Sequence, residues 1–206
     1  MSPVRVKICG ITRLEDALFA ARAGADALGF NFWPGSKRFI DPGAARAIVD
    51  LLPPFVTPVG VFVDQPPSEV LEAAARSGVR ALQLHGDEPP EQVKGYPFPT
   101  LKALRLSGRE DLAELARYEV AGFVLDAPSA EFGGSGRLCD WEIAREVAKR
   151  ATLLLAGGLD PDNVALAVRA VRPYGVDVAS GVESSPGVKN HAKLARFVSA
   201  AKKEAA

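Results

Sequence analysis

The chain has 206 residues, 48% of them hydrophobic, and its 25 basic and 25 acidic side chains give a formal net charge of zero. This length can bury one large core or two small ones. Because no long run carries one sign of charge, the sequence indicates neither a nucleic-acid partner nor a membrane partner. It has no apolar stretch near eighteen residues and no signal-peptide pattern, so we expect a cytoplasmic protein. The two cysteines, Cys9 and Cys139, have no metal-binding spacing, which predicts reduced thiols and no metal site.

Short apolar runs alternate with helical patterns along the whole chain. The predicted strands cover residues 4–9, 27–32, 58–63, 81–85, 100–104, 122–126, 152–156 and 176–179. The predicted helices cover residues 14–23, 42–52, 67–77, 89–94, 109–118, 140–150, 161–171 and 192–203. The pattern at 89–94 is the weakest, because two prolines and an early glycine interrupt it. Eight strands that alternate with eight helices indicate parallel strands joined by right-handed crossovers.

These elements predict an α/β fold, a single-domain (βα)8 TIM barrel that spans residues 1–206. An open doubly wound sheet is the alternative. Eight complete units and the lack of a Rossmann-type glycine fingerprint after the first strand favour the barrel. Alternation in the first strand also favours it: Val6 and Ile8 share one face, whereas Lys7 and Cys9 share the other, which would point into the barrel.

Polar side chains gather at the predicted carboxyl ends of the strands, where barrels of this kind carry their chemistry. The set comprises Cys9, Lys37, Arg38, Asp64, His85, Arg105 and Asp126. Each has a structural alternative when it is considered alone. A free cysteine is usually a small buried hydrophobe, and a strand-end histidine is often a satisfied core residue. Their joint placement at one end of the barrel favours an active site.

Glycine-containing turns follow the last two strands, Gly157-Gly158 after the seventh and Ser180-Gly181 after the eighth. Glycine lets a ligand approach the backbone closely, and the loops after strands seven and eight commonly hold phosphate in these barrels. No Walker motif is present, so we do not expect a nucleoside triphosphate. A third glycine-rich segment, residues 132–137, is either a flexible linker or a lid over the substrate.

Six sequence runs together resemble the phosphoribosylanthranilate isomerase family of the tryptophan pathway. They are KICGIT (7–12), FWPGSKRFI (32–40), QLHGDE (83–88), FGGSGRLCDW (132–141), AGGLDPDNV (156–164) and DVASGVESSPGVK (177–189). The runs extend from the first strand to the last helix, in the family's order. The resemblance implies a TIM barrel that converts N-(5-phosphoribosyl)anthranilate, a small phosphorylated substrate, to an open-chain 1-deoxyribulose product without metal or organic cofactor.

Carried over by motif, the resemblance assigns roles to single residues. Cys9 would be the general base and Asp126 the general acid, whereas Arg38 would bind the anthranilate carboxylate. His85 and Asp177 are assigned to substrate binding as well. The chemistry is an Amadori rearrangement, in which an acid opens the sugar ring and a base removes the proton from C2′.

The turns at Gly157–Gly158 and Ser180–Gly181 would hold the phosphate. The sequence departs from the family pattern at Arg137, Cys139 and Asn190, which puts the details of the predicted lid in doubt but not the reaction. On the first strand, Lys7 shares a face with the predicted base and would stabilise its thiolate.

Other functions are kept as alternatives. One alternative is another phosphosugar barrel. An indole-glycerol-phosphate synthase would need a lysine as the acid, and a histidine-pathway isomerase would need paired aspartates at strand ends. A phosphate-ligand binder without catalysis is another, although both proton-transfer groups are present.

We also expect a homodimer, because residues such as Met, Asn and Gln are scarce and association is one route to higher stability. Phe55, in the proline-stiffened loop Pro53-Pro54-Phe55, is the predicted docking residue. The alternative is that Phe55 packs under its own barrel.

Overall fold

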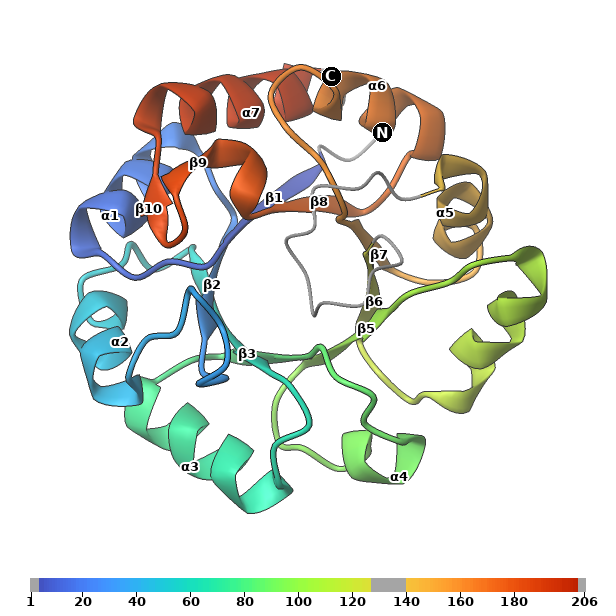
Figure 1. Cartoon of the computed structure of the whole chain (residues 1–206), viewed down its shortest axis with the longest axis horizontal. Helices are drawn as coiled ribbons and strands as arrows, with labels where there is room; N and C mark the ends of the chain where they lie inside the picture. Colours follow the sequence, from blue (N-terminus) through green and yellow to red (C-terminus); the bar gives the residue numbers. More distant parts are fainter. Residues whose placement is uncertain (1–3, 127–139, 204–206) are drawn as a thin grey trace.

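The computed structural model describes residues 4–126 and 140–203. Its eight parallel strands form a closed ring in sequence order, in which β1 pairs with both β2 and β8 (Figure 1). The strands are β1 (Arg5–Cys9), β2 (Ala27–Asn31), β3 (Thr57–Phe62), β4 (Ala81–Leu84), β5 (Thr100–Leu104), β6 (Gly122–Leu125), β7 (Leu153–Leu155) and β8 (Gly175–Val178). The (βα)8 barrel is therefore confirmed, and the open doubly wound sheet is excluded.

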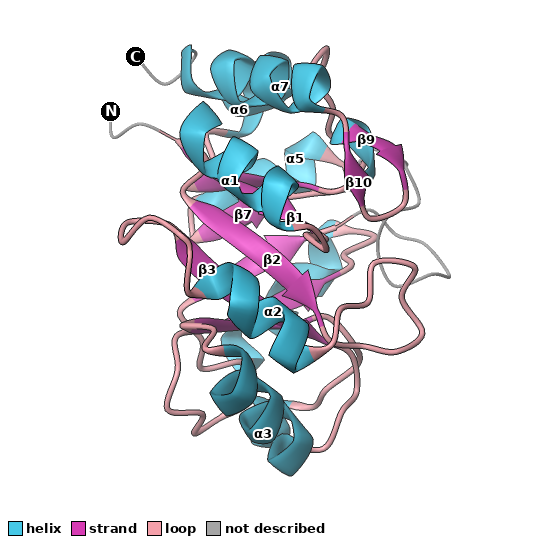
Figure 2. Cartoon of the chain, turned by 90° about the vertical axis from the view of Figure 1, so that its left-hand side faces the viewer, coloured by secondary structure: helices cyan, strands magenta, loops and turns pink. Residues whose placement is uncertain are grey.

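Helices surround the ring on its outside (Figures 1 and 2). They are α1 (Leu14–Ala23), α2 (Pro42–Val49), α3 (Pro67–Ser77), α4 (Pro90–Val93), α5 (Trp141–Ala148), α6 (Val164–Val171), α7 (His191–Lys203) and the 3₁₀ helix η1 (Arg109–Arg117). Local signals set several ends. Asp41 caps α2 by accepting from the Gly43 and Ala44 amides, and Gly24 ends α1 in the left-handed conformation. None of the described helices combines the length and the apolar character needed to cross a membrane.

Three segments differ from the prediction. Residues 109–117 form a 3₁₀ helix whose buried side chains, Leu112 and Leu115, are three residues apart, which matches the 3₁₀ period. Helix α6 begins at Val164 instead of residue 161, because Asp160 accepts from the backbone N–H groups of the next turn. The segment after β8 was expected to be a turn. It forms a short 3₁₀ helix, η2 (Ser180–Val182), and a hairpin of β9 (Glu183–Ser185) and β10 (Val188–Lys189).

The apolar core has two parts. The larger part lies between the strands and the helices and includes Val6 and Ile8, as the alternation in the first strand predicted. The smaller part lies inside the barrel and consists of Ala103, Val124, Leu154 and Ala156 from β5, β6 and β7 and the residue after β7, with Leu101 packed against it. On the opposite side the interior is polar. Lys7 on β1 forms an ion pair of 2.9 Å with Asp177 on β8, and both side chains are almost fully buried.

Asp26 ties the starting ends of the first two strands to the last helix. Its carboxylate accepts from the Val6 backbone N–H and from Arg5, both at 2.9 Å, and lies 3.0 Å from the Lys202 ammonium. Burial acts to raise the pKa of Asp26, but the Val6 amide and the two cations hold it below its usual value. The ionised carboxylate is therefore the form that stabilises the fold.

We predict that Asp26→Asn lowers stability at neutral pH and that this deficit shrinks in acid. A carboxyl group with a lowered folded-state pKa contributes fully above its unfolded pKa of about 3.9, and the contribution is lost as the pH falls through the folded value. Urea unfolding of both proteins at pH 7 and pH 3 measures it. Asp50→Asn, at an exposed pair with Arg46, is the control. An equal deficit for Asp26→Asn at both pH values would contradict the prediction.

Candidate active site

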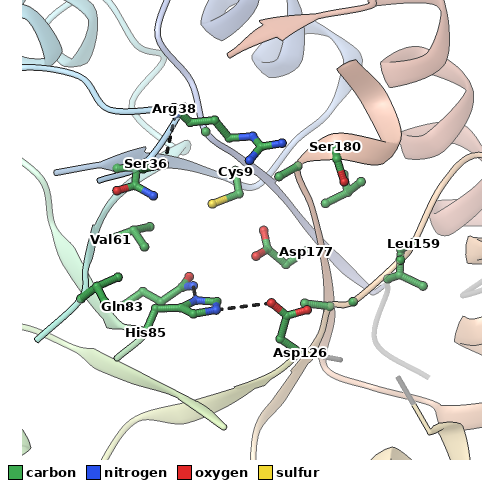
Figure 3. A pocket seen from close by; sticks show the side chains of 18 residues that line it. Cys9, Ser36, Arg38, Val61, Gln83, His85, Asp126, Leu159, Asp177 and Ser180 are labelled. Carbon is green, nitrogen blue, oxygen red and sulfur yellow. Dashed lines mark hydrogen bonds and ion pairs between the residues drawn. The ribbon is translucent and has the colours of Figure 1, made fainter. Parts of the chain in front are cut away.

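A cavity lies at the carboxyl ends of the strands, and both polar and apolar side chains line it (Figure 3). Most of the predicted site residues line it: Cys9, Arg38, His85, Asp126, Gly157, Gly158, Asp177 and Ser180. Asn31, Ser36, Val61 and Gln83 also line it and were not predicted. The hairpin β9–β10 lies on the face of the barrel that carries the carboxyl ends of the strands, which is the side toward which the β2 arrow points (Figure 2).

Cys9 is the last residue of β1, and its half-buried thiol faces the cavity. The neighbouring strand makes room for it with a glycine, because a Cβ on Gly29 would lie 2.8 Å from the Cys9 Sγ and 3.2 Å from the Lys7 Nζ. The thiol and the Lys7 ammonium are therefore neighbours above Gly29. Burial raises the pKa of the Cys9 thiol, although Lys7 and Lys189 act to lower it. The expected influence of Lys7 is present, but burial outweighs it.

Gly10 follows Cys9 and supports a second site residue. It has a φ of 75°, and a Cβ there would lie 2.5 Å from the Arg38 Cδ. The backbone conformation and the close approach of Arg38 both require glycine at this position. The side chain of Arg38 thus lies against the turn that follows the thiol. Lys37, its neighbour, is exposed and does not line the cavity.

Asp126 follows β6 and faces the cavity with His85, the residue after β4 (Figure 3). The Asp126 Oδ2 lies 3.3 Å from the His85 Nε2. On the other side of the ring, the His85 Nδ1 lies 2.8 Å from the amide nitrogen of Gln83, which is fully buried. With the Gln83 amide donating to Nδ1, the imidazole carries its proton on Nε2, toward Asp126. His85, predicted to bind substrate, is thus in contact with the predicted acid.

Arg38 is held by a carboxylate that sequence reasoning missed. Its Nε and NH2 groups donate to Glu183 at 2.8–3.2 Å, which fixes the plane of the guanidinium. Lys189, across the hairpin, donates to the same carboxylate at 2.8 Å and to the backbone oxygen of Cys9 at 2.5 Å. The sequence signal for these residues was their position in the run at 177–189 that resembles the family. Their contacts could not be predicted, because hairpin pairing and a separation of 180 residues cannot be seen in local patterns.

The two predicted phosphate turns pack directly on each other. Gly157 and Gly158 have φ values of 75° and 65°, and the side chain of Asn163 donates to the Gly158 oxygen at 2.9 Å. Gly181 starts the neighbouring turn with Ser180, and a Cβ on it would lie only 2.0 Å from the backbone oxygen of Leu159. The glycines are therefore needed both for left-handed backbone and for this contact. Gly181 itself does not line the cavity, whereas the other three predicted residues do.

The remaining predicted positions lie elsewhere. Asp64 and Arg105 do not line the cavity: Asp64 accepts from the Asp87 backbone N–H, and Arg105 pairs with the Asp87 side chain. The predicted lid at 132–137, with Arg137 and Cys139, falls outside the described residues. Within the ranges 4–126 and 140–203, no three His, Cys, Asp or Glu side chains lie close enough together to hold a metal ion.

Residues 6–200 match the family model described as N-(5'phosphoribosyl)anthranilate (PRA) isomerase. The N-(5'-phosphoribosyl)anthranilate isomerase of Myxococcus xanthus is 50% identical over 204 residues, which cover 97% of this chain and 96% of the relative. The crystal structure of the Thermotoga maritima phosphoribosyl anthranilate isomerase superposes with a TM-score of 0.91 at 46% identity, over 97% of this chain and 99% of the other.

Two further solved structures add to this. A phosphoribosyl anthranilate isomerase in complex with reduced 1-(o-carboxyphenylamino)-1-deoxyribulose 5-phosphate has a TM-score of 0.88 at 43% identity and covers 97% and 99% of the two chains. Engineered monomers of the dimeric enzyme from Thermotoga maritima have a TM-score of 0.87 at 42% identity, with the same coverage.

Proposed function

The chain belongs to the N-(5′-phosphoribosyl)anthranilate isomerase family, and from this premise we propose how its residues catalyse the family's reaction. The reaction converts N-(5′-phosphoribosyl)anthranilate to 1-(2-carboxyphenylamino)-1-deoxyribulose 5-phosphate in tryptophan biosynthesis. The observation that carries the proposal is that a thiol and a carboxyl group, Cys9 and Asp126, face one cavity together with an oriented guanidinium and two glycine turns.

Asp126 acts as the general acid. In its protonated form it gives its proton to the ring oxygen of the substrate's ribose, so that the bond between this oxygen and C1′ breaks and a Schiff base forms. After this step, the carboxylate carries the charge that the proton left behind. The Nε2–H of His85, 3.3 Å away, is placed to stabilise that carboxylate and to orient it. This role replaces direct substrate binding as our assignment for His85.

Cys9 acts as the general base. As a thiolate it removes the proton from C2′ of the Schiff base, and the electron pair of that bond moves to form an enolamine. The enolamine then tautomerises to the ketone product. Because burial raises the pKa of the Cys9 thiol, the thiolate needs nearby positive charge, and the Lys7 ammonium supplies it. Asp177 holds Lys7 in place through their buried ion pair.

The two ends of the substrate are held by opposite sides of the cavity. Arg38, oriented by Glu183, binds the anthranilate carboxylate. The backbone N–H groups of the turns at Gly157–Gly158 and Ser180–Gly181 bind the phosphate. The left-handed conformation of Gly157 and Gly158 lets their amides converge on an anion. With both ends fixed, the ring oxygen and C2′ lie between Asp126 and Cys9.

We propose that the protein is a homodimer that associates through the amino-terminal face of the barrel. Phe55, in the loop before β3, is 94% exposed, so it does not pack under its own barrel. It borders a hollow of about 520 Å3 at the starting ends of the strands, together with Thr57, Leu101, Leu154 and Tyr174. An exposed aromatic next to an apolar hollow fits a contact in which each copy places Phe55 in the other's hollow. Both active sites then stay open.

We also place the reaction in the cytoplasm. The proposed base is a free cysteine, and only a reducing compartment keeps such a thiol reliably reduced.

The overall function is tested by the fluorescence of the substrate. Purified protein should make the fluorescence of phosphoribosylanthranilate decay with turnover, far faster than the decay without protein. A protein that binds the reduced product but leaves the fluorescence decay unchanged would be a binder that has lost the reaction.

Cys9→Ala and Asp126→Asn should each fold normally and lose about 10²–10⁴-fold in kcat/KM, because each removes a positioned proton-transfer group. Circular dichroism and steady-state rates of substrate decay measure the two effects. Lys37→Met, at an exposed residue outside the cavity, is the control and should keep the turnover of the wild type. Turnover near that of the wild type in Cys9→Ser or in Asp126→Asn would contradict the assigned roles.

Arg38→Lys should weaken binding of the carboxylate-bearing reduced product by roughly 10–100-fold, because a lysine cannot replace a bidentate guanidinium. Its effect on kcat at saturating substrate should be smaller. Calorimetric titration gives the affinity. Lys37→Met is the matched control, because this neighbouring cation is exposed and outside the cavity, and it should bind like the wild type. Equal losses in the two variants would argue against Arg38 as the carboxylate-binding residue.

Sedimentation at micromolar concentration should show twice the chain mass of 21.8 kDa. Phe55→Ser should shift the equilibrium toward the monomer, because it removes the proposed docking side chain. Leu166→Ser, at an apolar residue on α6 that is 52% exposed, should remain dimeric. A monomeric wild type would refute the dimer, and a dimeric Phe55→Ser variant would refute the docking role.

A further inference from the structure

The hairpin β9–β10 brings two buried charged residues to the end of the first strand. Glu183 and Lys189 are paired in the hairpin register, and their side chains are 5% and 0% exposed. They follow the turn assigned to phosphate in the chain, and Lys189 contacts the backbone oxygen of Cys9, whose thiol is assigned as base. The acid–base steps described above require neither hairpin residue to touch the substrate, so their burial needs its own explanation.

Glu183 connects two residues of the proposed site. It accepts from the Nε and NH2 groups of Arg38 and from the ammonium of Lys189, all at 2.8–3.2 Å. Burial acts to raise the pKa of Glu183, but the Arg38 guanidinium and the Lys189 ammonium together hold it below its usual value. The carboxylate is therefore charged at neutral pH, and it sets the distance between the two cations.

Lys189 reaches the strand that carries the thiol. Its ammonium donates to the backbone oxygen of Cys9 at 2.5 Å as well as to Glu183. Burial lowers the pKa of Lys189, and the attraction of Glu183 and of Cys9 opposes that effect. Withdrawing a lysine from water is energetically costly, so a buried lysine with no function beyond packing would be easily replaced by an apolar side chain. Its position next to Cys9 suggests what the buried charge does, because a nearby ammonium stabilises a thiolate.

The thiol is surrounded by three cations, each with its own carboxylate or backbone partners. Lys7 pairs with Asp177, whereas Lys189 and Arg38 share Glu183. All three interact electrostatically with Cys9. The two carboxylates keep the cations in place. Asp177 also acts on Cys9 and raises the pKa of its thiol, whereas Lys7 and Lys189 act to lower it, so the fixed cations are what stabilise the negative charge that develops on sulfur.

We propose that Glu183 and Lys189 are positioning residues for this reaction: Lys189 fixes the end of β1 and stabilises the Cys9 thiolate, and Glu183 holds Lys189 and Arg38 in one frame. The proposal rests on the proposed role of Cys9 as the base. If both roles hold, the hairpin is part of the site, because Glu183 and Lys189 connect the Arg38 guanidinium, which binds the carboxylate, to Cys9, which removes the C2′ proton.

The test measures the thiolate directly, through the rate of Cys9 alkylation by iodoacetamide as a function of pH. A Cys139→Ser background removes the second thiol. Lys189→Met should move the midpoint of the rate profile upward by about one pH unit, which is about a tenfold loss of thiolate below the midpoint. Lys189→Arg should restore most of the shift, because it keeps the charge. Lys193→Met is the control, since the ammonium of this exposed lysine donates to the backbone oxygen of Glu183 and not to its carboxylate, and its midpoint should not move.

Steady-state kinetics should also distinguish the roles of the two residues. For Lys189→Met, kcat/KM should fall about tenfold near pH 7 and recover as the pH rises, because the thiolate then forms without help. For Glu183→Gln, KM and the dissociation constant of the reduced product should rise more than kcat falls, because Arg38 loses its fixed orientation. If Lys189→Met does not fold, Lys189→Gln carries the same expectation.

An unchanged alkylation midpoint in a folded Lys189→Met or Lys189→Gln variant would overturn the proposal. So would a Lys189→Arg variant that shifts as far as Lys189→Met, because that result indicates packing and not charge. These outcomes differ from a failure of the base assignment itself. In that case Cys9→Ser would retain turnover, whatever happens to the alkylation profile of the Lys189 variants.

Discussion

Closure of the barrel between its first and last strands is the constraint on which the site depends. Lys7 and Asp177 are direct neighbours in the β1–β8 register and form an ion pair whose side chains are only 1% and 7% exposed. Removing one partner of such a pair leaves an uncompensated buried charge, at a cost of roughly 3–5 kcal/mol. The pair therefore disfavours any arrangement in which the two strands are separated or shifted. It also brings Cys9, two residues beyond Lys7, beside the turn that follows Asp177.

A second buried carboxylate organises the opposite side of the strand ends. Glu88 accepts from the backbone N–H groups of Asp64 and Gly86 and pairs with Lys102 at 2.9 Å. It thereby joins the ends of β3, β4 and β5 in the sector where α4 has only four residues to cover the sheet. His85 precedes Gly86, so this cluster fixes the position from which the imidazole reaches Asp126. Glu88 and Glu183 thus act alike, each holding several strand ends that carry site residues.

Much of the architecture could be predicted from the sequence, because it depends on local patterns. The alternation of Val6 and Ile8 with Lys7 and Cys9 gave the inner and outer faces of the first strand, and glycines marked the ends of helices such as α1. Since parallel strands place their carboxyl ends together, polar residues at those ends predicted the members of the cavity. The same argument overpredicted Asp64 and Arg105, which follow strands but both contact Asp87 outside the cavity. The partners of Arg38 and Cys9 could not be predicted, because they depend on contacts across 145 and 180 residues.

That long separation has a consequence for how the protein is made. Strand β1 leaves the ribosome first, and its second neighbour, β8, emerges with the last part of the chain, as does the hairpin that holds Lys189 against Cys9. A nascent or truncated chain that stops before residue 175 therefore exposes two open strand edges, on β1 and β7, and such edges promote association between incomplete chains. The Cys9 thiol of such a chain is also without the nearby Lys189 cation. Because β8 and the hairpin are synthesised last, the site cannot form until the ring closes. Aggregation therefore competes with folding mainly during the interval before closure.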